Sequence, residues 1–179
     1  MIRFVKRRNL LLLFMAVMFF VGGIVSLFSE TLCLYVEERT NGEQGPFPPP
    51  VKEGIYNGLF EENYIVFDTG DKAIYNVDWK KGLFATVLEV AREGGARYVI
   101  AVKVDSKLVK DKERGDHVSI NSRYYVVDVE KGVLLGKGSL SGSNRGEEKE
   151  VNQSKLGFSI GMKIARAIDK SIKKHTDAF

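Results

Sequence analysis

Asp68 is the side chain in this sequence whose neighbours give it the clearest opportunity for chemistry. It stands in the run Tyr64-Ile65-Val66-Phe67-Asp68-Thr69-Gly70, where an apolar stretch leads into an Asp-Thr-Gly triplet. A carboxyl group in such a triplet can share a proton with the carboxyl of a second copy and so activate a water molecule. The sequence therefore admits a hydrolytic hypothesis that rests on Asp68 alone.

This triplet is the pattern of aspartic proteases, and Leu134-Leu135-Gly136-Lys137 imitates a second stretch of their single-domain members. The surroundings of the triplet favour another interpretation. Those proteases are almost wholly β, whereas periodic apolar residues predict a helix on either side of Asp68. Because Asp-Thr-Gly is also ordinary turn chemistry at the end of a strand, the structural interpretation is favoured. Asp68 is kept as the one catalytic candidate.

No cofactor site and no metal site is predicted. The glycine-rich segment Gly136-Lys137-Gly138-Ser139-Leu140-Ser141-Gly142 departs from the dinucleotide fingerprint in spacing, and it extends a strand instead of joining a strand to a helix. An edge strand with a bulge explains it better. His117 and His175 are the only histidines, and with Cys33 they offer no plausible set of metal ligands. The single cysteine also excludes an intrachain disulfide.

The residues that we predict to bind a partner lie in connections, because loops on a rigid scaffold commonly carry recognition. One candidate is Phe47, in the proline-rich loop 39–50. Two more are Trp79 and the neighbouring Lys80, since an aromatic side chain in a loop can anchor a partner. The fourth is Arg114, in the mixed-charge loop 106–116, although a solvated connection is the favoured interpretation of that loop.

The N-terminal segment predicts export. A basic head, Arg3 to Arg8, precedes an apolar run from Leu10 to Phe28. The run is longer than a usual signal-peptide core and close to the roughly 20 residues that span a bilayer, so both a cleaved signal and a retained anchor stay open. The basic residues come first, which places everything after Ser29 outside the cytoplasm, either periplasmic or anchored in the inner membrane.

The net charge of +4 belongs to this segment. Arg3, Lys6, Arg7 and Arg8 are the only charged residues before Glu30, so the rest of the chain is formally neutral. A neutral domain lacks the basic face with which nucleic-acid binders neutralise phosphates. Nucleic acid is therefore not an expected partner, and no small-molecule substrate is evident. We expect residues 1–29 to be signal or anchor, 30–174 to form one domain, and 175–179 to be a tail.

Periodicity predicts the elements that would position these side chains. In the first half of the chain we expect a strand at Thr31–Glu37, a helix from about Pro50 to Glu62 and a short strand at Tyr64–Phe67. A second helix is expected to carry the apolar stripe Leu83, Phe84, Val87, Leu88 and Ala91 and to end at Gly94-Gly95. We then expect a strand at Ala96–Val104, a hairpin of Val118–Val129 and Val133–Leu135 joined by Glu130-Lys131-Gly132, and a last helix from about Gln153 to Lys174. The order β-α-β-α-β-β-β-α predicts an α+β fold, a two-layer mixed five-stranded sheet preceded by the N-terminal hydrophobic helix. Right-handed crossovers suggest that the first two helices share one face.

The arrangement resembles a group of small α/β domains from the bacterial cell envelope. Its marks are Gly58-Leu59-Phe60, the run Tyr64 to Asp68, the run Ala91-Arg92-Glu93-Gly94-Gly95-Ala96-Arg97-Tyr98-Val99-Ile100, and the turn Val127-Asp128-Val129-Glu130-Lys131-Gly132. The group includes the amino-terminal domain of TolB, the penicillin-binding-protein activator LpoB, and related domains of CsgG and FlgT. The resemblance covers residues 31 to 173. The chain departs from LpoB in having no lipobox before Cys33, and from TolB in having no propeller.

The resemblance implies a non-enzymatic adaptor or accessory protein that docks on other envelope proteins. Two alternatives stay open. The chain can be a structural subunit of an envelope or flagellar assembly, in which an exposed strand ending near Ser143 pairs edge to edge with another copy. The other alternative is an aspartic-type peptidase that uses Asp68.

Overall fold

Six parts of the chain are described by the computed structural model: residues 29–41, 50–69, 77–78, 83–109, 117–145 and 153–176. The elements are β1 (Thr31–Thr40), α2 (Val51–Glu61), β2 (Ile65–Asp68), β3 (Val77–Asp78), β4 (Leu83–Phe84), α3 (Ala85–Glu93), β5 (Tyr98–Val109), β6 (His117–Asp128), β7 (Val133–Arg145) and α4 (Gln153–Thr176). The apolar run 10–28 lies outside these residues. Among the helices that are described, none has the length and apolar character that crossing a bilayer requires.

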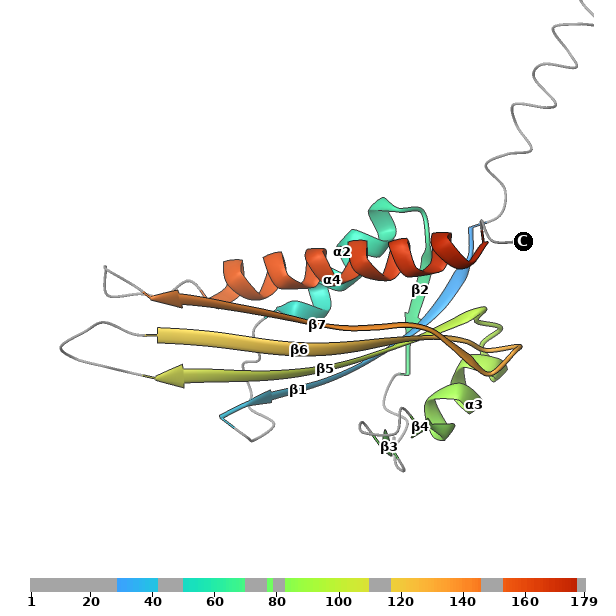
Figure 1. Cartoon of the computed structure of the whole chain (residues 1–179), viewed down its shortest axis with the longest axis horizontal. Helices are drawn as coiled ribbons and strands as arrows, with labels where there is room; N and C mark the ends of the chain where they lie inside the picture. The colour runs from blue at the N-terminus through green and yellow to red at the C-terminus, as the bar shows by residue number, and fades with distance from the viewer. Residues whose placement is uncertain are drawn as a thin grey trace, which may run out of the picture.

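The main sheet has five strands in the order β2-β1-β5-β6-β7 (Figure 1). β1 runs parallel to both β2 and β5, while β5, β6 and β7 form an antiparallel meander. The predicted mixed five-stranded sheet and its order of elements are therefore confirmed. β7 is an edge strand, as predicted, and its register with β6 shifts between Val126 and Val127, so that Leu135 is the extra residue, just before the glycine-rich segment in which a bulge was predicted.

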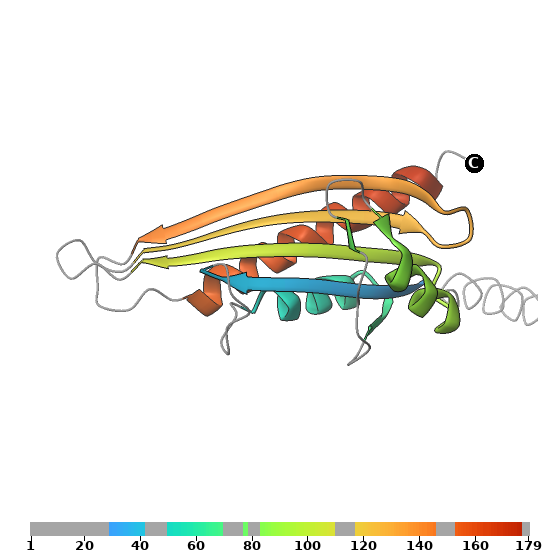
Figure 2. The same cartoon turned by 90° about the horizontal axis from the view of Figure 1, so that it is seen from below.

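The first two helices cover opposite faces of the sheet, so the prediction that they share one face is wrong. α2 packs with α4 on one side, and α3 lies on the other side against β1 and β5 (Figures 1 and 2). From β1 the chain moves outward through α2 to β2, and from β2 it moves back across β1 through α3 to β5. Right-handed crossovers in opposite directions place their helices on opposite faces.

Two hydrophobic cores follow from this arrangement. The larger core lies under α2 and α4 and contains Leu34, Ile55, Ile100 and Ile164. The smaller core lies under α3 and contains Cys33, Val87 and Ala101. Alternate residues of β1 and β5 enter the two cores in turn, which explains why Tyr98 to Val102 read as apolar on both faces.

The start of α3 differs from the expectation. Leu83 and Phe84 were assigned to the helix stripe, but they form β4, which pairs antiparallel with β3. Phe84 is still buried in the smaller core, where its ring lies 5.2 Å from that of Tyr125. A buried apolar residue fits either element at a helix start, so periodicity could not separate the two. The far end agrees with expectation, because Gly95 has φ +70.

Two strands are clearly longer than predicted. β1 reaches Thr40 and β5 reaches Val109, whereas β7 ends at Arg145, two residues past its predicted end near Ser143. The sequence predicts loops at the ends of β1 and β5 because the polar residues there lack apolar alternation. In the structure Ser106 is buried, and its Oγ donates a hydrogen bond of 3.1 Å to the Arg39 carbonyl oxygen. Backbone pairing with neighbouring strands thus extends the sheet past the apolar stretches.

Candidate functional site

On the side of α3, one half of the sheet carries a polar face that no described helix covers. With nine residues, α3 is about 14 Å long, whereas the twelve residues of β5 extend about 40 Å. Among the described helices only α3 lies on that side, and the strands continue well beyond it (Figure 2). We define the polar face by the side chains of the strands beyond α3 that point away from α2 and α4: Glu37, Arg39, Lys103, Asp105, Lys107, Ser119, Asn121, Arg123, Ser139, Ser141 and Ser143.

The register arranges these side chains in rows across the sheet. Glu37, Lys103, Arg123 and Ser139 form one row, and the next row runs from Arg39 through Asp105 and Asn121 to Ser141. Neighbours within a row have Cβ atoms about 4.5–5.5 Å apart, close enough to act on one ligand surface. The polar face therefore brings charged and hydroxyl groups from four strands together.

Glu37 forms the acidic centre of the β1 side of this face. Its carboxylate lies 2.8 Å from the Arg39 guanidinium and 3.8 Å from the Lys103 ammonium group. The Glu37 side chain is only 10% exposed, and that of Lys103 is 16% exposed. Charges so far removed from water must compensate one another, because leaving one of them alone would be costly. This cluster therefore fixes the side chains of the face in place.

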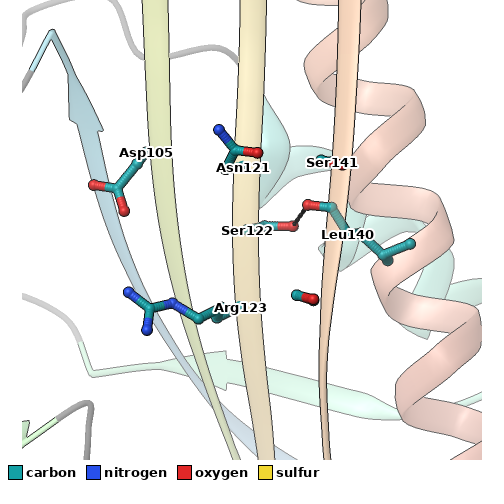
Figure 3. A pocket seen from close by; sticks show the side chains of 7 residues that line it. Asp105, Asn121, Ser122, Arg123, Leu140 and Ser141 are labelled. Carbon is teal, nitrogen blue, oxygen red and sulfur yellow. Dashed lines mark hydrogen bonds between the residues drawn. The ribbon is translucent and has the colours of Figure 1, made fainter.

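A shallow depression of about 270 Å³ lies on the β5–β7 side, lined by Asp105, Asn121, Ser122, Arg123, Ser139, Leu140 and Ser141. Figure 3 shows the side chains of Asp105 and Arg123 extending from their strands toward β1. Within the part of the chain that the structure describes, neither the Asp105 carboxylate nor the Arg123 guanidinium forms an ion pair or a side-chain hydrogen bond. Ser122 is different, since its Oγ donates to the Leu140 carbonyl oxygen at 2.8 Å and is buried (Figure 3). Asp105, Asn121 and Arg123 are the side chains open to a partner.

The polar face has the side chains to bind a polar or charged surface. It offers guanidinium and ammonium donors, a carboxylate acceptor, an amide and hydroxyl groups. A nucleophile hydrogen-bonded to a general base, the arrangement needed for covalent catalysis, does not occur among its side chains. Within the described ranges, no group of three or more His, Cys, Asp or Glu side chains converges in a way that would hold a metal ion.

Asp68, the catalytic candidate, ends β2 on the other side of the sheet from this face. Its Oδ2 accepts a hydrogen bond of 2.8 Å from the Lys52 ammonium group of α2. Burial and then Asp68 raise the pKa of Tyr56 to about 12, and burial together with Asp68 raises the pKa of Cys33 to about 11. The carboxylate therefore acts here as the partner of a lysine beside two groups that stay protonated.

The four predicted partner-binding residues, Phe47, Trp79, Lys80 and Arg114, lie outside the described residues. Their role in binding a partner therefore stays a prediction. The residues predicted from sequence to bind a partner do not include the polar face, because its side chains stand in long strands and the predicted residues lie in loops. One signal was available: Lys103, Asp105 and Lys107 alternate with Val102, Val104 and Ser106, which is the period of a strand with one solvated face.

The outer edge of β7 is the second surface of note. β7 has thirteen residues and pairs on one side with β6, and no described strand pairs with its other side. Gly136, Gly138 and Gly142 let neighbouring side chains approach closely, since a Cβ on Gly136 would lie 2.7 Å from the Ser171 Oγ. An edge strand of this length presents a row of backbone donors and acceptors that another strand can use.

Comparison with known proteins defines the class as a small α+β domain and gives no family. No protein-family model matches the chain, and no curated protein matches it either. The PelC dodecamer from Paraburkholderia phytofirmans is 16% identical with a TM-score of 0.56, over 76% of this chain and 84% of PelC. The hypothetical protein CT253 from Chlamydia trachomatis is 13% identical with a TM-score of 0.50, over 85% of this chain and 100% of that one.

The LpoB C-terminal domain from Salmonella enterica is also among the matching structures. It is 16% identical with a TM-score of 0.43, over 66% of this chain and 84% of the domain. LpoB, one of the proteins that the sequence was found to resemble, is thus among the structures that match this chain. At these identities the likeness concerns the fold alone.

Proposed function

We propose that this chain is a non-enzymatic interaction module of the cell envelope that binds an acidic protein surface on its polar face. The observation that carries the proposal is the open half of the sheet, where Asp105, Asn121 and Arg123 line a depression and extend toward solvent. The face holds four basic and two acidic side chains, a net charge of +2, and Glu37 contacts both Arg39 and Lys103. Lys107 and Arg123 are the cations left for a partner.

Export supports the envelope location. The basic head and the apolar run 10–28 predict that the folded domain works outside the cytoplasm, as a periplasmic protein or one anchored in the inner membrane. A rigid sheet with a fixed charge cluster suits an adaptor, since a preorganised surface binds without a large ordering cost.

Site-specific photocrosslinking in the native host tests this proposal. A photoreactive amino acid at Asn121, on the polar face, is compared with one at Lys163, an exposed position of α4 on the opposite side. We expect one envelope protein to crosslink from position 121 and not from position 163. Purified partner should then bind the Arg123→Glu variant at least tenfold more weakly than the Lys163→Glu variant, and more weakly at high salt. Equal crosslinking from both positions, or equal affinity of both variants, contradicts the proposal.

The second candidate function is a subunit of a self-assembling structure. Two observations favour it: the thirteen-residue outer edge of β7, and the dodecameric state of PelC, whose fold this chain shares. Light scattering across a concentration range, with the Ser141→Pro variant compared to wild type, separates the candidates. Proline removes a backbone donor and blocks edge pairing, so a self-assembling chain should become monomeric. A wild-type chain that is monomeric at every concentration removes this candidate.

A further inference from the structure

Four of the six large apolar side chains that are exposed among the described residues lie at one end of the molecule. Phe60 is 78% exposed, Ile65 56%, Val133 42% and Leu134 47%. Single exposed apolar residues are common and need no explanation. A concentration of them at one end is different, because exposed apolar surface gathered in one region marks a site of contact with another molecule or a membrane.

The register shows that Ile65 and Val133 share one level of the sheet. Ile65 pairs with Thr31 at one edge, and Leu32, one residue on, pairs with Tyr98. Tyr98 then pairs with Asp128, and Asp128 with Val133 at the opposite edge. The two edges of a five-stranded sheet lie roughly 19 Å apart. One end of the domain therefore has two apolar corners, one formed by Phe60 and Ile65 and the other by Val133 and Leu134. We call this end of the domain the junction end.

The junction end is where the chain from the N-terminal segment joins the domain. Ser29 donates a hydrogen bond through its Oγ to the carbonyl oxygen of Asn63, which follows α2 with φ +64. The Ile65 backbone N–H donates to the Glu30 carbonyl oxygen at 3.0 Å. The first described residues are thus held between the end of α2 and the start of β2. α4 also ends at this side of the molecule (Figure 1).

The apolar run ends one residue before this point. Leu10 to Phe28 contains no charged residue, and Ser29 is already fixed on the domain. One extended residue covers about 3.5 Å, so no linker separates the run from the junction end. If the run is retained in a bilayer, the apolar corners cannot lie far from the membrane interface.

Two cations of the junction end are paired with carboxylates. The Arg97 guanidinium lies 2.6 Å from the Glu30 carboxylate, and the Lys173 ammonium group lies 3.1 Å from the carboxylate of Glu62 and 2.9 Å from that of Asp169. Because these cations are already paired, we expect apolar contact to contribute more than attraction to anionic lipids.

We propose that the junction end is a membrane-contact surface, in which Phe60, Ile65, Val133 and Leu134 enter the interface of the bilayer that holds residues 10–28. The anchor fixes the distance of the domain from the bilayer, and the two apolar corners fix its orientation. The long axis of the sheet then points away from the membrane (Figure 2), which places the polar face at a distance where other envelope proteins reach it.

Depth-dependent fluorescence quenching of the full-length chain in lipid vesicles tests this proposal. A cysteine at position 60, 65 or 133 carries an environment-sensitive dye, in a Cys33→Ala background that leaves one thiol. The matched controls are cysteines at Val109 and Phe158, the two exposed apolar residues away from the junction end. The vesicles are phosphatidylcholine alone or mixed with phosphatidylglycerol, each with nitroxide-labelled lipid.

We expect at least a twofold greater quenching at positions 60, 65 and 133 than at 109 and 158, with little change between the two lipid mixtures. Equal quenching at both ends overturns the proposal. A dye signal at the junction end that rises with protein concentration and is insensitive to nitroxide lipid also overturns it, because it assigns the apolar corners to a second copy. Quenching only in the anionic mixture contradicts the apolar mode of contact.

Discussion

Gly54 of α2 and Gly161 of α4 face each other where these two helices cross. A Cβ on Gly161 would lie 2.8 Å from the Gly54 Cα and would collide with the Val51 carbonyl oxygen. One turn along, a Cβ on Gly58 would lie 2.5 Å from the Ala165 Cβ. The absence of side chains at these positions lets the helices approach at backbone distance, and this contact holds α2 on the larger core.

The change Gly161→Ala should destabilise the domain by about 1–3 kcal/mol, although alanine is the better helix former by roughly 1 kcal/mol. The added methyl group would meet backbone atoms of α2, which cannot move aside as a side chain can. The free-energy cost of overpacking therefore exceeds the gain in helix propensity. Urea unfolding measures the difference. Ser159→Ala, at an exposed position of the same helix, is the matched control and should change stability by less than about 0.5 kcal/mol. A neutral Gly161→Ala variant would contradict the close crossing.

Tyr64→Phe should cost about 1–2 kcal/mol. The Tyr64 hydroxyl donates a hydrogen bond of 2.9 Å to the Asp169 carboxylate, which is 9% exposed, so the change leaves a buried acceptor with one contact fewer. Tyr124→Phe is the control, because burial alone raises the pKa of Tyr124 and its hydroxyl forms no hydrogen bond with the described residues. If both variants unfold at the same urea concentration, the Tyr64–Asp169 bond contributes nothing.

Stability should fall as pH rises from 9 to 11. Burial raises the pKa of Cys33 from its ordinary value of 9.0 to about 11. The unfolded chain therefore releases the thiol proton first, and the folded state loses its relative stability up to the folded pKa. The expected loss is roughly 2 kcal/mol. Urea unfolding at several pH values measures it, and Cys33→Ala should show a smaller loss over the same range. An equal loss in both proteins would assign the effect to other groups.

Asp68→Asn should leave the fold intact and lower the pKa values of Tyr56 and Cys33. Asp68 raises both, and the amide carries no charge. The lost ion pair with Lys52 is about one-third exposed on the carboxylate side and should cost less than about 1 kcal/mol. Titration of the Tyr56 ring carbon by NMR follows the shift. A peptidase activity that is present in the wild-type chain and survives in the Asp68→Asn variant would remove the Asp68 hypothesis. A peptidase activity that is present in the wild-type chain and lost in this variant would show that the proposed non-enzymatic role is wrong.

Local periodicity predicted the elements because each one buries a continuous apolar stripe. Val51, Ile55 and Leu59 mark α2, and Ile160, Ile164 and Ile168 mark α4, whatever the rest of the chain does. The hairpin turn was likewise set locally, since Gly132 takes φ +64. The close helix crossing had a sequence signal as well, the small-residue spacing Gly54-x-x-x-Gly58, but that spacing does not say which helix approaches.

Tertiary structure decided what lies on each face. β2 returns the chain to the outer side of β1, and this reversal sends α2 and α3 to opposite faces, although each crossover obeys the same handedness. The open polar face then follows from length, because α3 is too short to cover strands that backbone pairing extends to Thr40, Val109 and Arg145. The sequence by itself thus determined the elements and the predicted route of export. The pairing of strands far apart in the chain decided which polar side chains meet, since cross-strand neighbours depend on register and not on sequence distance.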